Sequence, residues 1–392
     1  MKTCVSAAPC PWSTATARPS ITMVERRIPL ARPRLGEAES AALRQVVESG
    51  ILSRGCQLET FEAGMARLTG SAGGVGVNSG TVGLQITMEA LGIGPGDEVI
   101  APAFTFVGTV NAIVRAGAKP VLVDVDEHTL NIDPASAGAA INDRTRAIMV
   151  VHLFGRPAPM DELLALAGDH ELFVVEDACE AIGASYKGRA VGGLGDAGVF
   201  GFYPNKPIAT GEGGMIVGND PDFLTRCRQL RNQGSDTVTA TRHAGLPGFS
   251  ARLSELHAAL GSVQLQRLEE SLARRRAVAE RYCQNLGDHP ALQLLPPAAE
   301  HETIAWFTFP LRLRDGTRAD RDRLIASLSA EGIDCGVYFE PVHHLPYHDQ
   351  QHDGRALPVS EQAGDQSIAL PLYPELGSED VDRICRRFTD IL

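Results

Sequence analysis

Long apolar runs are missing from this sequence. No stretch approaches the roughly 20 apolar residues that a membrane-spanning helix needs. The first residues also lack the continuous apolar segment of a secretory signal. The sequence therefore predicts a protein without a membrane partner, and we expect it in the cytoplasm.

Several sequence motifs are also missing, and each absence excludes a class of protein. The eight cysteines are scattered and form no Cys-x-x-Cys pair, which argues against a zinc knuckle or a disulfide framework. Gly74 and Gly76 lack the third glycine of a dinucleotide fingerprint, and no phosphate-binding Gly-Lys loop occurs. Positive charge is in the minority, with a net charge of −12. This balance argues against nucleic acid as a partner.

Residues 1–27 differ in composition from the rest of the chain. They are rich in Ser, Thr, Ala and Pro and show no periodic pattern. We favour a disordered tail, or a start codon placed too early with Met23 as the true start. A transit peptide is the less favoured alternative.

Short apolar runs alternate with helical or turn-rich segments through the first half of the chain. This alternation is typical of an α/β protein with a mostly parallel sheet covered by helices on both faces. We assign residues 28–250 to this large domain. The runs are residues 75–77, 98–101, 121–125, 147–153, 172–175, 199–202 and 215–217.

The pattern changes near residue 250. Residues 251–286 are rich in Leu, Ala, Arg and Glu at helical spacing and predict one or two helices. We expect residues 251–392 to form a linking helix and a smaller C-terminal α+β domain. Its other predicted elements are strands over residues 304–313 and 333–339 and helices over residues 318–331 and 378–391.

Lys206 lies in a turn between two of the apolar runs, residues 199–202 and 215–217. A lysine held between buried strands is partly desolvated, which favours the neutral amine. A neutral amine is the nucleophile that a Schiff base with a carbonyl group requires. For a lone lysine, exposure on the surface would be the better interpretation.

Three further features support the reactive interpretation of Lys206. Asp177 ends an apolar run, where a carboxylate could keep a pyridine nitrogen protonated, although it could also cap the next helix. Gly80 and Thr81 follow another run and open a helix, a place suited to phosphate. Phe106 follows a third run and could stack on a flat cofactor or pack in the core. Because parallel strands end at one edge, these features together predict a pyridoxal 5'-phosphate (PLP) site.

The chain resembles the DegT/StrS-type sugar aminotransferases, which are fold-type-I PLP enzymes. The resemblance runs from about residue 28 to the end. It rests on residues 78–81 (Asn-Ser-Gly-Thr), 92–100, 102–107, 175–184, 202–206, 210–214 and 370–374.

The resemblance implies a role for individual residues. Lys206 and Asp177 would be catalytic: Lys206 would form the Schiff base with PLP and move a proton, and Asp177 would pair with the ring nitrogen. Glu180 would lie beside the ring. Cofactor binding would involve Gly80, Thr81, Phe106, Asp177, Glu180, Lys206 and Ser250.

The resemblance also implies the reaction and the assembly. We expect transfer of an amino group from glutamate to a nucleotide-linked keto sugar, in polysaccharide or antibiotic sugar biosynthesis. Glu180 favours a 4-keto-6-deoxy sugar, as in perosamine synthases. A homodimer would share its active sites through residues 248–253. Alternatives are a cyclitol or other keto-substrate aminotransferase of this family, and a non-catalytic regulator with the same fold.

Two departures from the family pattern concern the phosphate. Gly201 stands where relatives often have serine, and Ser250 where they often have asparagine. Separately, His343, His344 and His348 have spacings compatible with metal ligation. No acidic or cysteine partner is evident near them, and transamination needs no metal, so we predict no metal site.

Overall fold

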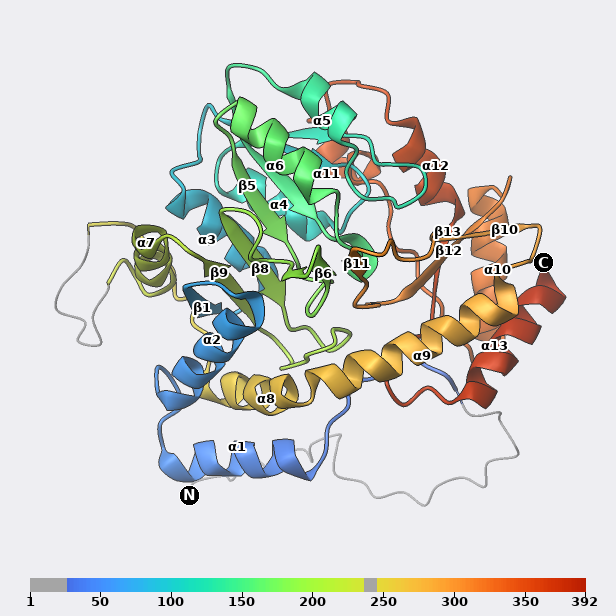
Figure 1. The fold of residues 1–392 in the computed structure, drawn as a ribbon, viewed down its shortest axis with the longest axis horizontal. Coiled ribbons are helices and arrows are strands. Elements are labelled where there is room, and N and C mark those ends of the chain that lie inside the picture. Colours follow the sequence, from blue (N-terminus) through green and yellow to red (C-terminus); the bar gives the residue numbers. More distant parts are fainter. Residues whose placement is uncertain (1–26, 236–244) are drawn as a thin grey trace, which may run out of the picture.

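A seven-stranded sheet forms the centre of the protein. The computed structural model describes residues 27–235 and 245–392 (Figure 1). The strand order is β1-β9-β8-β5-β4-β2-β3, and β9 alone in this sheet runs antiparallel to both of its neighbours. The mostly parallel sheet predicted from the sequence is confirmed. Its strands are β1 Gly73–Val77, β2 Glu98–Pro102, β3 Lys119–Val123, β4 Thr145–Val151, β5 Phe173–Asp177, β8 Ala197–Gly201 and β9 Gly214–Gly218.

Both faces of this sheet are buried. Along β4, Ile148 and Val150 belong to one hydrophobic cluster, whereas Ala147 and Met149 belong to another. Because neighbouring side chains of a strand point to opposite faces, each face has its own core. The accompanying helices are α1 Glu37–Ser49, α2 Cys56–Thr69, α3 Gly80–Ala90, α4 Val107–Arg115, α5 Pro134–Ala140, α6 Met160–Asp169 and α7 Pro221–Arg231.

Two consecutive helices connect the large sheet to the C-terminal part. They are α8, Glu255–Gln266, and α9, Leu268–Leu286, separated at Arg267. Helix α8 packs against α1 and α2, and α9 reaches α13, Ser378–Ile391 (Figure 1). The sequence left one or two helices open here, and the structure has two. The domain division near residue 250 stays a prediction.

The C-terminal part has a small antiparallel sheet of its own, in the order β10-β12-β13. A third buried cluster lies between this sheet and helices α9, α10 and α13. Its strands are β10 Leu292–Leu294, β12 Phe309–Leu313 and β13 Ser367–Leu370. The remaining elements are β6 Ser185–Tyr186, β7 Arg189–Ala190, β11 Glu302–Thr303, the short helices η1 Leu153–Gly155, η2 Val342–His344 and α11 Pro346–Asp349, and helices α10 Arg318–Ala330 and α12 Pro358–Gln366.

The strand predicted over residues 333–339 is wrong. Its backbone pairs only at isolated bridges, from Ile333 to Ile28 and from Gly336 to Ala369. The apolar side chains that suggested a strand have another role. Tyr338 and Phe339 stack on each other and line a cavity. The predicted strand over residues 304–313 is also shorter, since β12 begins at Phe309.

The described part of the chain begins at Arg27. The predicted tail, residues 1–27, lies outside the described residues except for Arg27, which pairs with Asp334 at 2.7 Å. Within residues 27–235 and 245–392, no helix combines the length and apolar character that crossing a membrane requires.

Glu255 links α8 to the start of α2, and its loss should destabilise the fold. Helix α2 follows Gly55, which has no side chain to cap it, and the buried Glu255 carboxylate accepts from the backbone N–H of Gln57 (2.9 Å) and Leu58 (3.0 Å). We expect Glu255→Ala to lower the free energy of unfolding by about 2 kcal/mol. Urea unfolding measures this, with the exposed Glu280→Ala as control. Equal stability of the two variants would contradict the prediction.

Candidate active site

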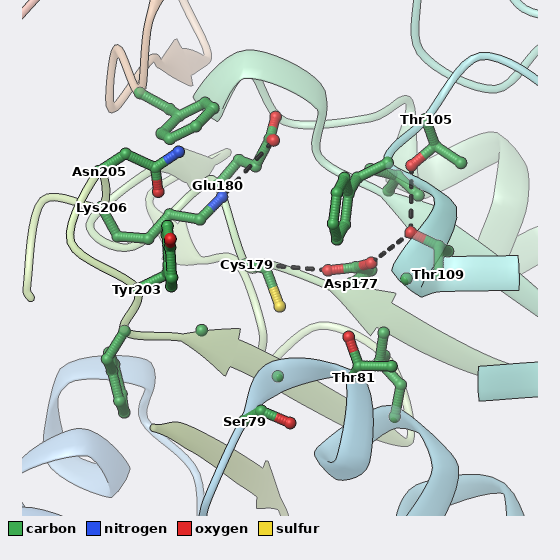
Figure 2. Close-up of a pocket in the computed structure, with 18 of the residues that line it drawn as sticks. Ser79, Thr81, Thr105, Thr109, Asp177, Cys179, Glu180, Tyr203, Asn205 and Lys206 are labelled. Atoms are coloured by element: carbon green, nitrogen blue, oxygen red, sulfur yellow. Dashed lines mark hydrogen bonds and ion pairs between the residues drawn. The ribbon is translucent and has the colours of Figure 1, made fainter. Parts of the chain in front are cut away.

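A cavity of about 410 Å³ lies beyond the carboxyl ends of the parallel strands (Figure 2). Open parallel sheets bind ligands at this edge. Its lining includes Ser79, Gly80, Thr81, Thr105, Phe106, Thr109, Asp177, Cys179, Glu180, Gly201, Tyr203, Asn205, Lys206, Phe307, Tyr338 and Phe339.

Asp177 is the last residue of β5 and is buried. One carboxylate oxygen accepts from Oγ1 of Thr109 at 2.7 Å, and the other accepts from the backbone N–H of Cys179 at 3.1 Å (Figure 2). Thr109 in turn lies 3.1 Å from Oγ1 of Thr105. The carboxylate is therefore held in one orientation at the cavity wall.

A second buried carboxylate, that of Glu176, lies behind Asp177. Its oxygens accept from the backbone N–H groups of Gly192, Leu194 and Gly195 at 2.6–2.7 Å. Its Oε2 also lies 2.9 Å from Nε2 of His152, whose Nδ1 accepts from the N–H of Ala158. The same histidine donates its backbone N–H to the carbonyl of Asp177 at 3.2 Å. This network fixes the end of β5, and an acid within an apolar strand was the only sequence signal for it.

Lys206 lies in the connection between β8 and β9, as the sequence predicts. Its side chain is 13% exposed. Its Nζ lies 3.6 Å from Oε1 of Glu180 (Figure 2). The same atom lies 3.9 Å from the ring centre of Phe307. The amine thus points into the cavity, held by a carboxylate and an aromatic face.

Glu180 is the partner of Lys206 and is buried. Its other oxygen accepts from the backbone N–H of Phe154 at 2.9 Å. Burial raises the pKa of the Glu180 carboxyl, and the nearby Lys206 charge opposes this. Burial therefore favours the protonated form of Glu180 more than exposure to water would.

The first turn of α3 forms the floor of the cavity. Ser79 caps the helix by accepting from the N–H of Val82 at 3.2 Å, and Gly80 and Thr81 follow it. A helix start offers backbone N–H groups and a partial positive charge, which suit a phosphate. Thr81 adds a hydroxyl (Figure 2).

Glycines keep this floor open. A Cβ added to Gly80 would meet Sγ of Cys179 at 2.7 Å, so only glycine leaves the helix start clear. Burial, followed by the charge of Asp177, raises the pKa of the Cys179 thiol, which stays neutral. A Cβ on Gly201 would meet the same sulfur at 3.4 Å, an ordinary contact, so position 201 has room for a Cβ.

Gly80→Ala should weaken cofactor binding by about 10- to 100-fold, because the new methyl group displaces the cradle or Cys179. Absorbance titration with PLP measures the affinity. The double variant Gly80→Ala/Cys179→Ala removes the clash and should recover most of it, and Cys179→Ala alone serves as control. Wild-type affinity in Gly80→Ala would refute the steric argument.

Aromatic side chains form the wall opposite the sheet. Phe106 is 55% exposed, and its ring centre lies 6.1 Å from that of Phe339. Phe339 stacks on Tyr338 and on Phe154. The Tyr338 hydroxyl accepts from the side-chain amide of Asn205 at 3.3 Å. The sequence pointed to Phe106 but missed Phe154 and the residues near position 338, since they come from distant segments without a motif.

Ser250 is the one predicted site residue that this chain does not place at the cavity. It is exposed and accepts from Nη2 of Arg252 at 2.8 Å. Arg231 is buried in an ion pair with Glu62 and donates to the carbonyl of Gly76 at 2.8 Å, so its guanidinium is not free to bind an anion. Arg231 therefore has a structural role.

The residues at the cavity fit one cofactor. A lysine amine, an oriented carboxylate, an open helix start and an aromatic wall match the aldehyde, ring nitrogen, phosphate and ring of PLP. These residues lie at the mostly parallel sheet that contains the antiparallel strand β9. Fold and site thus define a PLP enzyme of fold type I.

Comparison with known proteins shows the family. The chain matches the DegT/DnrJ/EryC1/StrS aminotransferase family over residues 33–389, and it belongs to that family. The enzymes of this family depend on PLP, which confirms the cofactor predicted from the sequence.

Solved structures agree with this assignment. DesV from S. venezuelae, in complex with a ketimine intermediate, is 37% identical, with a TM-score of 0.84 and coverage of 90% of this chain and 93% of that one. Spr1654 from Streptococcus pneumoniae, in its PLP-form, is 26% identical, with a TM-score of 0.89 and coverage of 93% and 98%. A 3-amino-5-hydroxybenzoic acid synthase is 27% identical, with a TM-score of 0.87 and the same coverage.

Proposed function

We propose that this aminotransferase moves an amino group from glutamate to a nucleotide-linked keto sugar. Glutamate would leave as 2-oxoglutarate, and the ketone would become an amine. The observation that carries the proposal is the position of Lys206, whose amine lies 3.6 Å from Glu180 in the cavity that Asp177 also lines. Bound PLP supplies an electron sink for the carbon that loses its proton.

Each side chain at the cavity would have a separate role in binding the cofactor or in moving the proton. Lys206 would bind the cofactor covalently and carry the proton between substrate and cofactor carbons. Asp177, fixed by Thr109 and Cys179, would keep the ring nitrogen protonated. Gly80 and Thr81 would hold the phosphate, and Phe106 would cover the ring.

The nature of residue 180 supports a finer proposal. Glu180 favours a 4-keto-6-deoxy sugar as the acceptor, by the family resemblance at this position. Its carboxylate lies beside the reactive amine in the cavity, so residue 180 would be placed to contact the substrate. We therefore propose amination at C4.

A second subunit is part of the proposal. Phe106 and Tyr203 line the cavity yet are each 55% exposed in the single chain. Large exposed aromatic side chains at a cofactor cavity are typical of a surface that a partner covers. We propose a homodimer in which Ser250 of one chain approaches the cavity of the other.

Half-transamination tests the activity. The protein is loaded with PLP, freed of excess cofactor and mixed with glutamate. The absorbance of the lysine-linked cofactor should fall while one equivalent of 2-oxoglutarate forms per site. A 4-keto-6-deoxy nucleotide sugar should then restore the absorbance, whereas the 3-keto isomer should not. An unchanged spectrum with glutamate would favour a non-catalytic regulator.

Similarity to a 3-amino-5-hydroxybenzoic acid synthase favours a second candidate function, amination of a cyclic ketone that carries no nucleotide. The same assay separates the two. A cyclitol ketone that restores the absorbance, with no nucleotide sugar doing so, would establish the second candidate.

A further inference from the structure

A group of possible metal ligands lies outside the cofactor cavity. His343, His344 and Glu361 each place a ligand atom within 4.8 Å of the others. The two histidines belong to η2 and the glutamate to α12. The sequence showed the histidines but not their acid, because the fold brings Glu361 to them from α12, which follows α11 along the chain. None of the three lines the cofactor cavity.

His343 is the buried member of the group and is poorly paired. The residue is 5% exposed. Its Nε2 lies 3.4 Å from Oε1 of Glu361, and its Nδ1 has no hydrogen-bond partner among the described residues. Burying an imidazole costs free energy unless both nitrogens find partners. Among the described residues, the only hydrogen-bond partner of this buried imidazole is therefore the distant Glu361 carboxylate, which faces Nε2.

His344 is held in an orientation that suits a metal ligand. Its Nδ1 lies 3.2 Å from Oε1 of Glu340, and both oxygens of Glu340 accept from Arg318 at 2.7 Å. Since an ionised carboxylate only accepts, Nδ1 carries the proton and Nε2 keeps its lone pair. A carboxylate that orients a ligating histidine in this way is a recurrent support of metal sites.

One of the three separations in this group also fits a metal better than a hydrogen bond. With ligand bonds of about 2.0–2.1 Å, ligand atoms around a tetrahedral zinc ion lie roughly 3.3 Å apart. The 3.4 Å between Nε2 of His343 and Oε1 of Glu361 is close to that edge, and it is long for a hydrogen bond. Two imidazoles and a carboxylate select Zn²⁺ and its transition-metal neighbours over Mg²⁺ or Ca²⁺.

We propose that His343, His344 and Glu361 bind one transition-metal ion of the Zn²⁺ class. The ion ties η2 to α12. Because η2 follows soon after Tyr338 and Phe339, it also steadies the aromatic wall of the cofactor cavity from behind. Three protein ligands leave a fourth tetrahedral position, which water would fill.

Metal titration of the full-length, PLP-loaded chain tests the proposal. Co²⁺ is the probe, since its visible spectrum distinguishes nitrogen and oxygen ligands from cysteine thiolates. We expect one Co²⁺ per chain with no thiolate charge-transfer band, displacement by Zn²⁺, and no displacement by Mg²⁺. Zn²⁺ should also raise the temperature of unfolding by a few degrees.

The variants are chosen to leave the fold intact. Glu361→Gln and His344→Asn change side chains that are 47% and 35% exposed, and each should weaken binding at least about tenfold and remove the thermal shift. His128→Gln, at a side chain 67% exposed and remote in sequence, is the control and should bind as wild type. No saturable binding, or equal binding by all four proteins, would overturn the proposal.

Discussion

Replacing Lys206 with alanine is expected to abolish transamination, with a loss of at least about 10³-fold in kcat. The variant loses both the nucleophile that binds the cofactor and the base that moves the proton. Other residues at the cavity still bind PLP, so the variant should hold the cofactor without a covalent bond. Borohydride reduction followed by mass spectrometry should then find the cofactor mass on wild type and not on Lys206→Ala.

Lys187→Ala is the matched control for Lys206. This lysine is 52% exposed and forms a surface ion pair with Asp161, so its loss should leave activity unchanged. Cofactor mass on a different lysine of the Lys206 variant, or retained turnover, would contradict the assigned role.

Asp177→Asn is expected to lower kcat by roughly 10²- to 10⁴-fold while preserving the fold. Asparagine has nearly the same shape, and its carbonyl oxygen can still accept from the N–H of Cys179. What it removes is the negative charge that would hold a proton on the ring nitrogen. Steady-state kinetics should show the loss in kcat, with KM changing much less.

Thr109→Val provides the comparison for Asp177. It removes the 2.7 Å hydrogen bond to the carboxylate and leaves the charge in place. Its effect should be smaller, about tenfold or less, because the N–H of Cys179 still orients the other oxygen. Equal losses in the two variants would show that orientation, and not charge, is what Asp177 contributes.

The sequence predicted the parts of the site that follow strands. Asp177, Phe106 and Lys206 each come after a run of apolar residues, and the edge at which parallel strands end brings them together. Gly80 and Thr81 follow the same logic at the start of a helix. These residues could be found because local pattern and sheet topology suffice to place them.

The sequence could not predict the groups whose position depends on tertiary packing. Phe307 and Tyr338 reach the cavity from the C-terminal part of the chain, and nothing in their local pattern shows where that part docks. The segment over residues 333–339 resembled a strand because its apolar side chains pack in buried clusters, as those of a strand would. His152 and Glu176 form a pair only when β4 and β5 lie side by side.

The reversed direction of β9 has a consequence for how accurately the reactive amine is placed. Because β9 is antiparallel to β8, the connection over residues 202–213 leaves and re-enters the sheet at the same edge, and the strands at its two ends are paired from Ala197 with Gly218 to Gly201 with Gly214. A parallel neighbour would require the chain to cross to the opposite edge of the sheet before it re-entered. The loop that carries the amine is thus held at both ends by paired strands of the central sheet, and the register of these strands sets where the loop begins and ends. A shift of a helix outside the sheet would leave both ends of this loop in place.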